Sequence, residues 1–177
     1  MKNKTSIYWF RQDLRLNDNP ALTASVKNGT IIPIYILDND NSKDHKMGEA
    51  SRLWLHYSLI ELNKQLESKL IVVQGNPEDI LFDICSKETV TNIFWNRVYE
   101  PWGIDRDKKI KENLSKENIE INSFNGSLLW EPWDALKDDG TPYRVFTPFF
   151  RRGCMNATAP RRPIPKPEKI NYNQINK

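Results

Sequence analysis

Three loops, at 11–17, 38–47 and 96–103, carry the residues best suited to bind a ligand, and each follows a short apolar run. The loop after Ile7–Phe10 brings together Arg11, Asp13 and Arg15. Two guanidinium groups beside a carboxylate could hold a phosphate, or they could form a salt-bridge network that fastens this loop to a neighbouring domain. Because two of the three charges can neutralise each other locally, we favour the network and keep phosphate binding open.

The loop at 96–103 offers a different mixture of side chains. It carries the aromatic rings of Tyr99 and Trp102, the Glu100 carboxylate and the Arg97 guanidinium. A flat heteroaromatic ligand needs stacking surfaces together with a few polar groups that fix the ring edges. The alternative for Trp102 is packing beneath the domain or against a partner, and the two interpretations are evenly balanced.

The elements that position these loops alternate along the chain. Five apolar runs with strand character are separated by helical stretches, some of which begin with an Asn–Pro pair suited to a helix start. This pattern predicts an α/β fold, a doubly wound five-stranded parallel sheet in the order 3-2-1-4-5 with helices on both faces. The loops after strands one and four then flank the crevice where such sheets bind ligands. We expect strands at 6–10, 31–37, 70–74, 92–95 and 119–124, and helices from Asn19, Gly48, Pro77 and Asp105.

The pattern changes after Gly126, and four prolines follow between residues 160 and 167. We predict an α/β domain over residues 1–153, with a short helix near 146–152, and a Pro-rich basic linker over 154–177. From Arg144 onward there are eight Lys or Arg residues and one acid, Glu168, so this part carries +7 within a total of +3. A basic tail can contact nucleic acid or an acidic surface, although a solvated linker is the more common explanation.

The sequence lacks the signals of a membrane-spanning protein, of a metal site and of the common phosphate-loop and serine-hydrolase motifs. No apolar run reaches the roughly 18 residues of a membrane span, and the chain begins with a polar stretch, which favours a cytoplasmic location and no membrane partner. Neither cysteine has metal-ligand spacing, and no acid cluster completes a metal site around His45. The chain also lacks Gly-rich phosphate loops and a G-x-S-x-G elbow.

The opening motif resembles the N-terminal signature of the DNA photolyase/cryptochrome family. The resemblance covers roughly Ser6 to Pro167, nearly the whole chain, but only the N-terminal portion of a photolyase. Four further stretches support it, at 47–56, 95–107, 124–132 and 142–149; the opening motif itself reads Trp9-Phe10-Arg11-Gln12-Asp13-Leu14-Arg15-Leu16.

This resemblance implies a light-harvesting domain. The N-terminal α/β domain of the family holds an antenna chromophore, which is methenyltetrahydrofolate, a deazaflavin or FMN. A larger C-terminal helical domain holds FAD and the pocket for the pyrimidine dimer, so that domain is the expected partner and UV-damaged DNA is reached through it. We therefore expect the chromophore-binding domain of a deoxyribodipyrimidine photolyase, with no catalytic residues of its own and no repair activity alone. The alternatives are the sensory domain of a cryptochrome and a free-standing nucleotide-binding α/β protein.

The resemblance also assigns residues. His45 falls where folate-type members have a ligand-contacting histidine, whereas Gly103 stands where they have a glutamate. The run from Glu100 to Gly103, followed by Arg106, looks closer to deazaflavin-binding members, although Ser51 replaces an arginine that some of those use. Aromatic residues after Gly126 resemble the region where the family docks its second domain. The predicted chromophore site is His45, Met47, Tyr99, Glu100, Trp102 and Arg106, and Arg11, Asp13 and Arg15 are predicted for interdomain or phosphate contacts.

Overall fold

The computed structural model describes residues 4–39, 41–42 and 46–173. The chain forms two compact units. The first contains the described residues up to Gly126 together with those from Ile164 onward, and the second is Ser127–Pro163. The domain boundary that the sequence suggests at residue 153 falls inside the second unit, and it stays a prediction.

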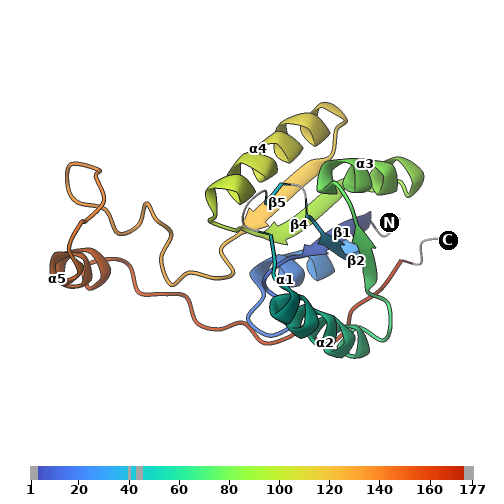
Figure 1. Ribbon diagram of the computed structural model, residues 1–177, viewed down its shortest axis with the longest axis horizontal. Coiled ribbons are helices and arrows are strands. Elements are labelled where there is room, and N and C mark those ends of the chain that lie inside the picture. Colours follow the sequence, from blue (N-terminus) through green and yellow to red (C-terminus); the bar gives the residue numbers. More distant parts are fainter. Residues whose placement is uncertain (1–3, 40, 43–45, 174–177) are drawn as a thin grey trace. The chain divides into compact units, whose positions relative to one another are not determined.

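A five-stranded sheet forms the centre of the first unit, and all four strand pairs in it are parallel (Figure 1). The strand order is β3-β2-β1-β4-β5, so the predicted doubly wound topology is confirmed. The strands are β1 (Lys4–Phe10), β2 (Gly29–Leu37), β3 (Ile71–Gln74), β4 (Asn92–Asn96) and β5 (Glu120–Phe124). The helices of this unit are α1 (Pro20–Asn28), α2 (Glu49–Gln65), α3 (Pro77–Lys87) and α4 (Pro101–Lys116).

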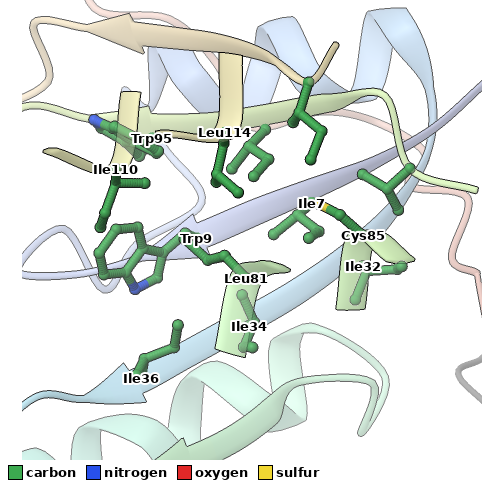
Figure 2. Close-up of a cluster of buried hydrophobic side chains, with 13 residues drawn as sticks. Ile7, Trp9, Ile32, Ile34, Ile36, Leu81, Cys85, Trp95, Ile110 and Leu114 are labelled. Carbon is green, nitrogen blue, oxygen red and sulfur yellow. The ribbon is translucent and has the colours of Figure 1, made fainter. Parts of the chain in front are cut away.

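Neighbouring residues of each central strand point to opposite faces of the sheet, so both faces carry apolar side chains that need covering. Helices cover both faces, as predicted. Ile7 and Trp9 of β1 belong to a core that includes Leu81 of α3 and Ile110 of α4 (Figure 2). Their neighbours Tyr8 and Phe10 belong to a second core with residues of α1 and α2. Full burial of a large apolar side chain contributes about 1.5–3 kcal/mol, so these central strands fix the fold.

The helix after β4 starts four residues earlier than expected. The sequence analysis placed its start at Asp105, whereas α4 begins at Pro101. The fixed φ of proline suits the first helical position, where its missing N–H costs nothing. The prediction that residues 96–103 form a loop is therefore wrong for Pro101, Trp102 and Gly103. Trp102 and Arg106 share one helix, one turn apart, and Glu100 is its N-cap residue.

Helix α2 leaves apolar side chains in contact with solvent. Its apolar residues recur at near-helical spacing, yet Leu62 is the one buried residue of the helix proper, followed by Leu66 at its C-cap. Leu53 is 59% exposed, Trp54 79% and Tyr57 61%. The outer apolar surface of α2 is thus unpartnered among the described residues.

The C-terminal segment returns to the sheet. Asn171 accepts a hydrogen bond from Ile31 N at 2.8 Å through its carbonyl oxygen, and Asn173 N donates to Ile31 O at 3.0 Å. Ile170 and Tyr172 pack against the second core. At the start of the segment, Asp18 N donates to Ile164 O at 2.7 Å, and Ile164 N donates to the Asp18 carboxylate at 3.1 Å. These contacts tie the segment to the first unit at both of its ends.

The second unit contains two short helices, α5 (Phe146–Pro148) and the π-helical η2 (Phe149–Cys154), in the place where a short helix was expected. Trp130 Nε1 donates to Thr158 O at 2.7 Å within this unit. The rings of Phe146 and Phe150 stack at 5.8 Å, and the side chains of both residues are largely exposed.

Candidate functional site

A cavity of about 970 Å³ opens where β1 and β2 end, beside the first turns of α2 and α4. Its volume lies within the roughly 300–1,000 Å³ typical of small-molecule sites. Four aromatic side chains line it, namely Trp9, Tyr35, Trp54 and Trp102. Charged groups reach it from separate elements, including Arg11, Arg15, Asp38, Glu100 and Arg106. This is the position, outside the carboxyl ends of the strands, where doubly wound sheets bind ligands.

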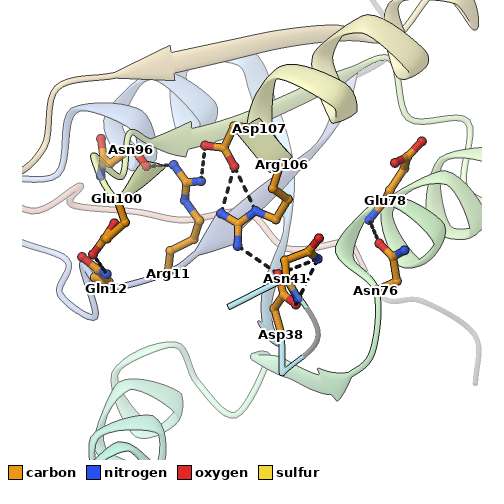
Figure 3. Close-up of polar contacts among 10 residues, drawn as sticks. All are labelled: Arg11, Gln12, Asp38, Asn41, Asn76, Glu78, Asn96, Glu100, Arg106 and Asp107. Carbon is orange, nitrogen blue, oxygen red and sulfur yellow. Dashed lines mark hydrogen bonds and ion pairs between the residues drawn. The ribbon is translucent and has the colours of Figure 1, made fainter. Parts of the chain in front are cut away.

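A buried ion network lies at one side of the cavity (Figure 3). Asp107 pairs with Arg11 at 2.5 Å and with Arg106 at 2.8 Å, and Arg106 also pairs with Asp38 at 3.1 Å. Arg11 donates a further hydrogen bond to the backbone oxygen of Asn96. The side chains of all four charged residues are at most 11% exposed. Two guanidinium groups and two carboxylates neutralise each other, and they link β1, the end of β2 and α4.

Arg106, predicted as a ligand-binding residue, is thus held by protein carboxylates. Its guanidinium lies 4.9 Å from the ring centre of Trp9 and 5.2 Å from that of Trp102. A direct contact between Arg106 and a ligand stays a prediction. The pKa of Arg11 is lowered, chiefly by burial, while Asp107 acts in the opposite direction. The Arg11 guanidinium nevertheless stays charged, as arginines do in proteins, and pairs with Asp107 as a cation.

Asp13 lies behind the cavity in a second polar cluster. Its carboxylate accepts hydrogen bonds from Tyr8 Oη at 2.8 Å, from Asn96 Nδ2 at 2.5 Å and from the backbone N–H of Arg11 at 3.1 Å. Burial, followed by the neighbouring Asp13 charge, raises the pKa of the Tyr8 hydroxyl well above its usual value. Tyr8 therefore stays protonated and donates to Asp13. This cluster fixes the β1–α1 loop to β4.

Arg15 lines the cavity from the same loop. Its guanidinium donates to the backbone oxygen of Asp18 at 3.0 Å and to that of Gly126. The phosphate or interdomain role proposed for Arg11, Asp13 and Arg15 stays a prediction. The contacts described for the three side chains all lie within the first unit.

Glu100 presents a carboxylate at the start of α4. One oxygen accepts a hydrogen bond from Gln12 Nε2 at 2.6 Å, and the other is buried without a hydrogen-bond partner among the described residues. Burial alone would raise the pKa of Glu100, but the Gln12 hydrogen bond and the Arg106 charge hold it below its usual range. The carboxylate is therefore ionised at neutral pH and accepts hydrogen bonds only.

Of the remaining residues predicted for the chromophore site, one lies in the described wall of the cavity. Met47 lines the cavity and is 38% exposed. Tyr99 is absent from the described lining, and His45 lies outside the described residues. Trp9 and Asp38 were not predicted as cavity residues. Asp38 directly follows a buried strand, which is a usable signal, whereas Trp9 has the appearance of an ordinary core residue in the sequence.

Comparison with known proteins identifies the family. The family model described as DNA photolyase matches residues 6–168. The chain belongs to the DNA photolyase family. A deoxyribodipyrimidine photo-lyase of Agrobacterium fabrum is 38% identical over 96% of this chain, and cryptochrome-1 of Arabidopsis thaliana is 33% identical over 97%. The crystal structure of a class III photolyase from Agrobacterium tumefaciens superposes with a TM-score of 0.89, at 36% identity over 99% of this chain.

These relatives of the photolyase family are much longer. The chain spans 36% of the Agrobacterium fabrum photo-lyase and 26% of the Arabidopsis cryptochrome. It corresponds to the N-terminal α/β domain of the family. Among its described residues, no helix is long and apolar enough to cross a membrane, and no group of three or more His, Cys, Asp or Glu side chains is placed to hold a metal ion.

Proposed function

We propose that the cavity of the first unit binds a light-harvesting chromophore: methenyltetrahydrofolate, a deazaflavin or FMN. The observation that carries this proposal is the composition of the wall, in which Trp102, Trp9 and Tyr35 surround a space of about 970 Å³. Aromatic faces stack on flat ring systems, and each such contact contributes about 0.5–1.5 kcal/mol beyond simple burial. All three chromophores are flat heteroaromatic molecules that fit this chemistry.

The polar groups of the wall complement the aromatic ones. The ionised Glu100 carboxylate accepts hydrogen bonds from ring N–H groups, and its charge strengthens them. The buried network of Arg11, Arg106, Asp38 and Asp107 holds this part of the wall in one arrangement before a ligand arrives. A preformed wall lowers the entropic cost of binding.

Spectroscopic titration of the three chromophores tests the proposal. Absorbance and fluorescence are followed in the near-ultraviolet and visible range for the parent chain and for Trp102→Ala and Glu100→Gln. Saturable binding of one chromophore, weakened in both variants, is the expected result. The matched control is Trp133→Ala, because this indole is 61% exposed and belongs to the second unit. Tight binding that neither cavity substitution affects would place the site elsewhere.

We further infer that the chain works as part of a longer protein. In this proposal a helical FAD domain is the partner, UV-damaged DNA is bound through that domain, and the excitation collected by the cavity chromophore drives pyrimidine-dimer repair. The similarity to cryptochrome-1 of Arabidopsis thaliana keeps a sensory role as the second candidate. The reading frame that follows Lys177 in the genome tests both candidates against a free-standing nucleotide-binding protein, because both require an in-frame helical extension with residues of an FAD pocket.

A further inference from the structure

Positively charged side chains lie over three tryptophans, two of which line the cavity. The guanidinium carbons of Arg11 and Arg106 lie 5.1 and 4.9 Å from the ring centre of Trp9. Arg106 also lies 5.2 Å from the ring centre of Trp102. Trp9 and Trp102 both line the cavity, and each has an arginine guanidinium over its ring.

The arrangement extends one residue deeper. Trp95 contacts Trp9 edge to face, with ring centres 5.5 Å apart. Arg11 lies 5.3 Å from the Trp95 ring centre, and the Lys111 ammonium lies 5.8 Å from it. Asp38 and Asp107 pair with the two guanidinium groups, whereas the Lys111 ammonium donates a hydrogen bond to Ser123 Oγ at 2.8 Å and forms no ion pair among the described residues.

A cation over an indole changes how readily the ring gives up an electron. The attraction between the cation and the π electrons stabilises the neutral ring. Removal of an electron turns the ring into a cation, and the attraction becomes repulsion. Water screens this repulsion little, because Trp9 and Trp95 are at most 1% exposed, while the paired carboxylates of Asp38 and Asp107 oppose part of it. The cations nearest the rings therefore make these indoles weaker electron donors than they would be without them.

Electron donation is the step by which a neighbouring indole destroys an excited state. An excited flavin or a similar chromophore takes one electron from the indole, which leaves an indole radical cation and a chromophore radical anion. Return of that electron regenerates both ground states, and the excitation energy is lost as heat. Stacking a chromophore on tryptophan therefore conflicts with storing its excitation.

We propose that Arg11, Arg106 and Lys111 protect Trp9, Trp95 and Trp102 from oxidation by an excited chromophore in the cavity. Trp102 then provides a stacking surface without acting as an electron donor, and the excitation survives long enough to be transferred. The inference rests on the proposed function, since it gives the cavity an excited ligand. It assigns to the buried arginines a photochemical role in addition to holding the wall.

Photo-oxidation by FMN tests the role of the cations directly. All proteins carry Trp54→Phe, because Trp54 lines the same cavity and is 79% exposed. Parent, Arg106→Met and Arg106→Lys proteins are illuminated with FMN, and oxidised Trp102 is quantified by peptide mass spectrometry. We expect oxidation of Trp102 to be several-fold faster in Arg106→Met than in the parent. Arg106→Lys, which retains the positive charge, should remain close to the parent.

A second variant covers the case in which Arg106→Met fails to fold. Lys111 forms no ion pair among the described residues, so Lys111→Met leaves the buried carboxylates paired. Oxidation of Trp95 should accelerate in this protein while that of the exposed Trp133 stays constant. Unchanged rates in these variants would overturn the inference. Equal acceleration in Arg106→Met and Arg106→Lys would also overturn it, because the cause would then be packing and not charge.

The outcome is independent of whether the proposed function holds. Dissolved FMN oxidises the partly exposed Trp102 by collision even if the cavity does not bind it, so the Arg106 comparison is made in either case, whereas the comparison at the buried Trp95 uses bound FMN. Absence of saturable binding in the chromophore titration would contradict the proposed function alone. If FMN does bind, its fluorescence lifetime should shorten in Arg106→Met and recover when Trp102→Phe is added.

Discussion

Replacement of Asp107 by asparagine should destabilise the first unit strongly. The carboxylate pairs with Arg11 at 2.5 Å and Arg106 at 2.8 Å, and the three side chains are 5–11% exposed. Asparagine keeps the shape but leaves two buried guanidinium groups with one remaining carboxylate, Asp38. Removing one partner from a buried ion pair costs about 3–5 kcal/mol. This is a large share of the roughly 5–15 kcal/mol that stabilises a typical domain.

Urea unfolding followed by circular dichroism, together with calorimetry, measures the effect. A loss of about 4 kcal/mol corresponds to a fall in Tm of about 8–16 °C for a chain of this size. The control is Asp83→Asn, which removes an ion pair with Lys87 at 2.8 Å whose side chains are 57% and 67% exposed. Exposed pairs contribute at most about 1 kcal/mol, so the control should unfold almost like the parent. A loss below about 1 kcal/mol in Asp107→Asn would refute the reasoning that this network is a stabilising ionic unit.

Three further predictions concern activity, association and pH. Residues 1–177 alone should not repair a thymine-dimer oligonucleotide under blue light, because the proposed function assigns FAD to a separate helical domain; measurable repair by the purified chain would contradict this. The exposed aromatic residues of the second unit, including Phe146 and Phe150, should bind a hydrophobic dye or mediate dimerisation. A strict monomer in sedimentation with no dye binding would count against that patch. Burial, followed by the Glu67 charge, raises the pKa of Tyr172 to about 12 from 10.0. The neutral hydroxyl is therefore favoured in the folded state, and its contribution to stability is present below pH 10 and lost between pH 10 and 12. The urea midpoint should therefore fall less between pH 9 and pH 12 in Tyr172→Phe than in the parent.

Much of the fold could be predicted because its signals are local. Asn19 and Asn76 precede prolines and cap α1 and α3, as expected from their sequence, and the all-apolar run in β2 is buried on both faces of the sheet. The start of α4 was predicted too late because the charged residues from Asp105 onward hid the signal of Pro101. Periodicity identified α2 but not its orientation, since it cannot show whether an apolar stripe finds a partner.

The candidate site depended on long-range contacts and was predicted less completely. Arg106 was expected to face a ligand, but one of its partners, Asp38, is 68 positions away and directly follows β2. Prolines in the C-terminal segment suggested a linker, and its hydrogen bonds to Ile31 depend on the free edge that β2 offers before the start of β3. Neither contact leaves a pattern within one stretch of sequence.

The contacts of Arg15 and Asp18 have a consequence for protein engineering. Arg15 holds the backbone oxygens of both Asp18 and Gly126, while Asp18 pairs with Ile164, so one small region of the β1–α1 loop binds the chain where it leaves the sheet unit and where it re-enters. Residues 127–163 therefore leave the first unit and return to it beside the same loop. We therefore expect a short glycine-rich bridge from Gly126 to Ile164 to be able to replace these residues, because both of its attachment points are held by the β1–α1 loop.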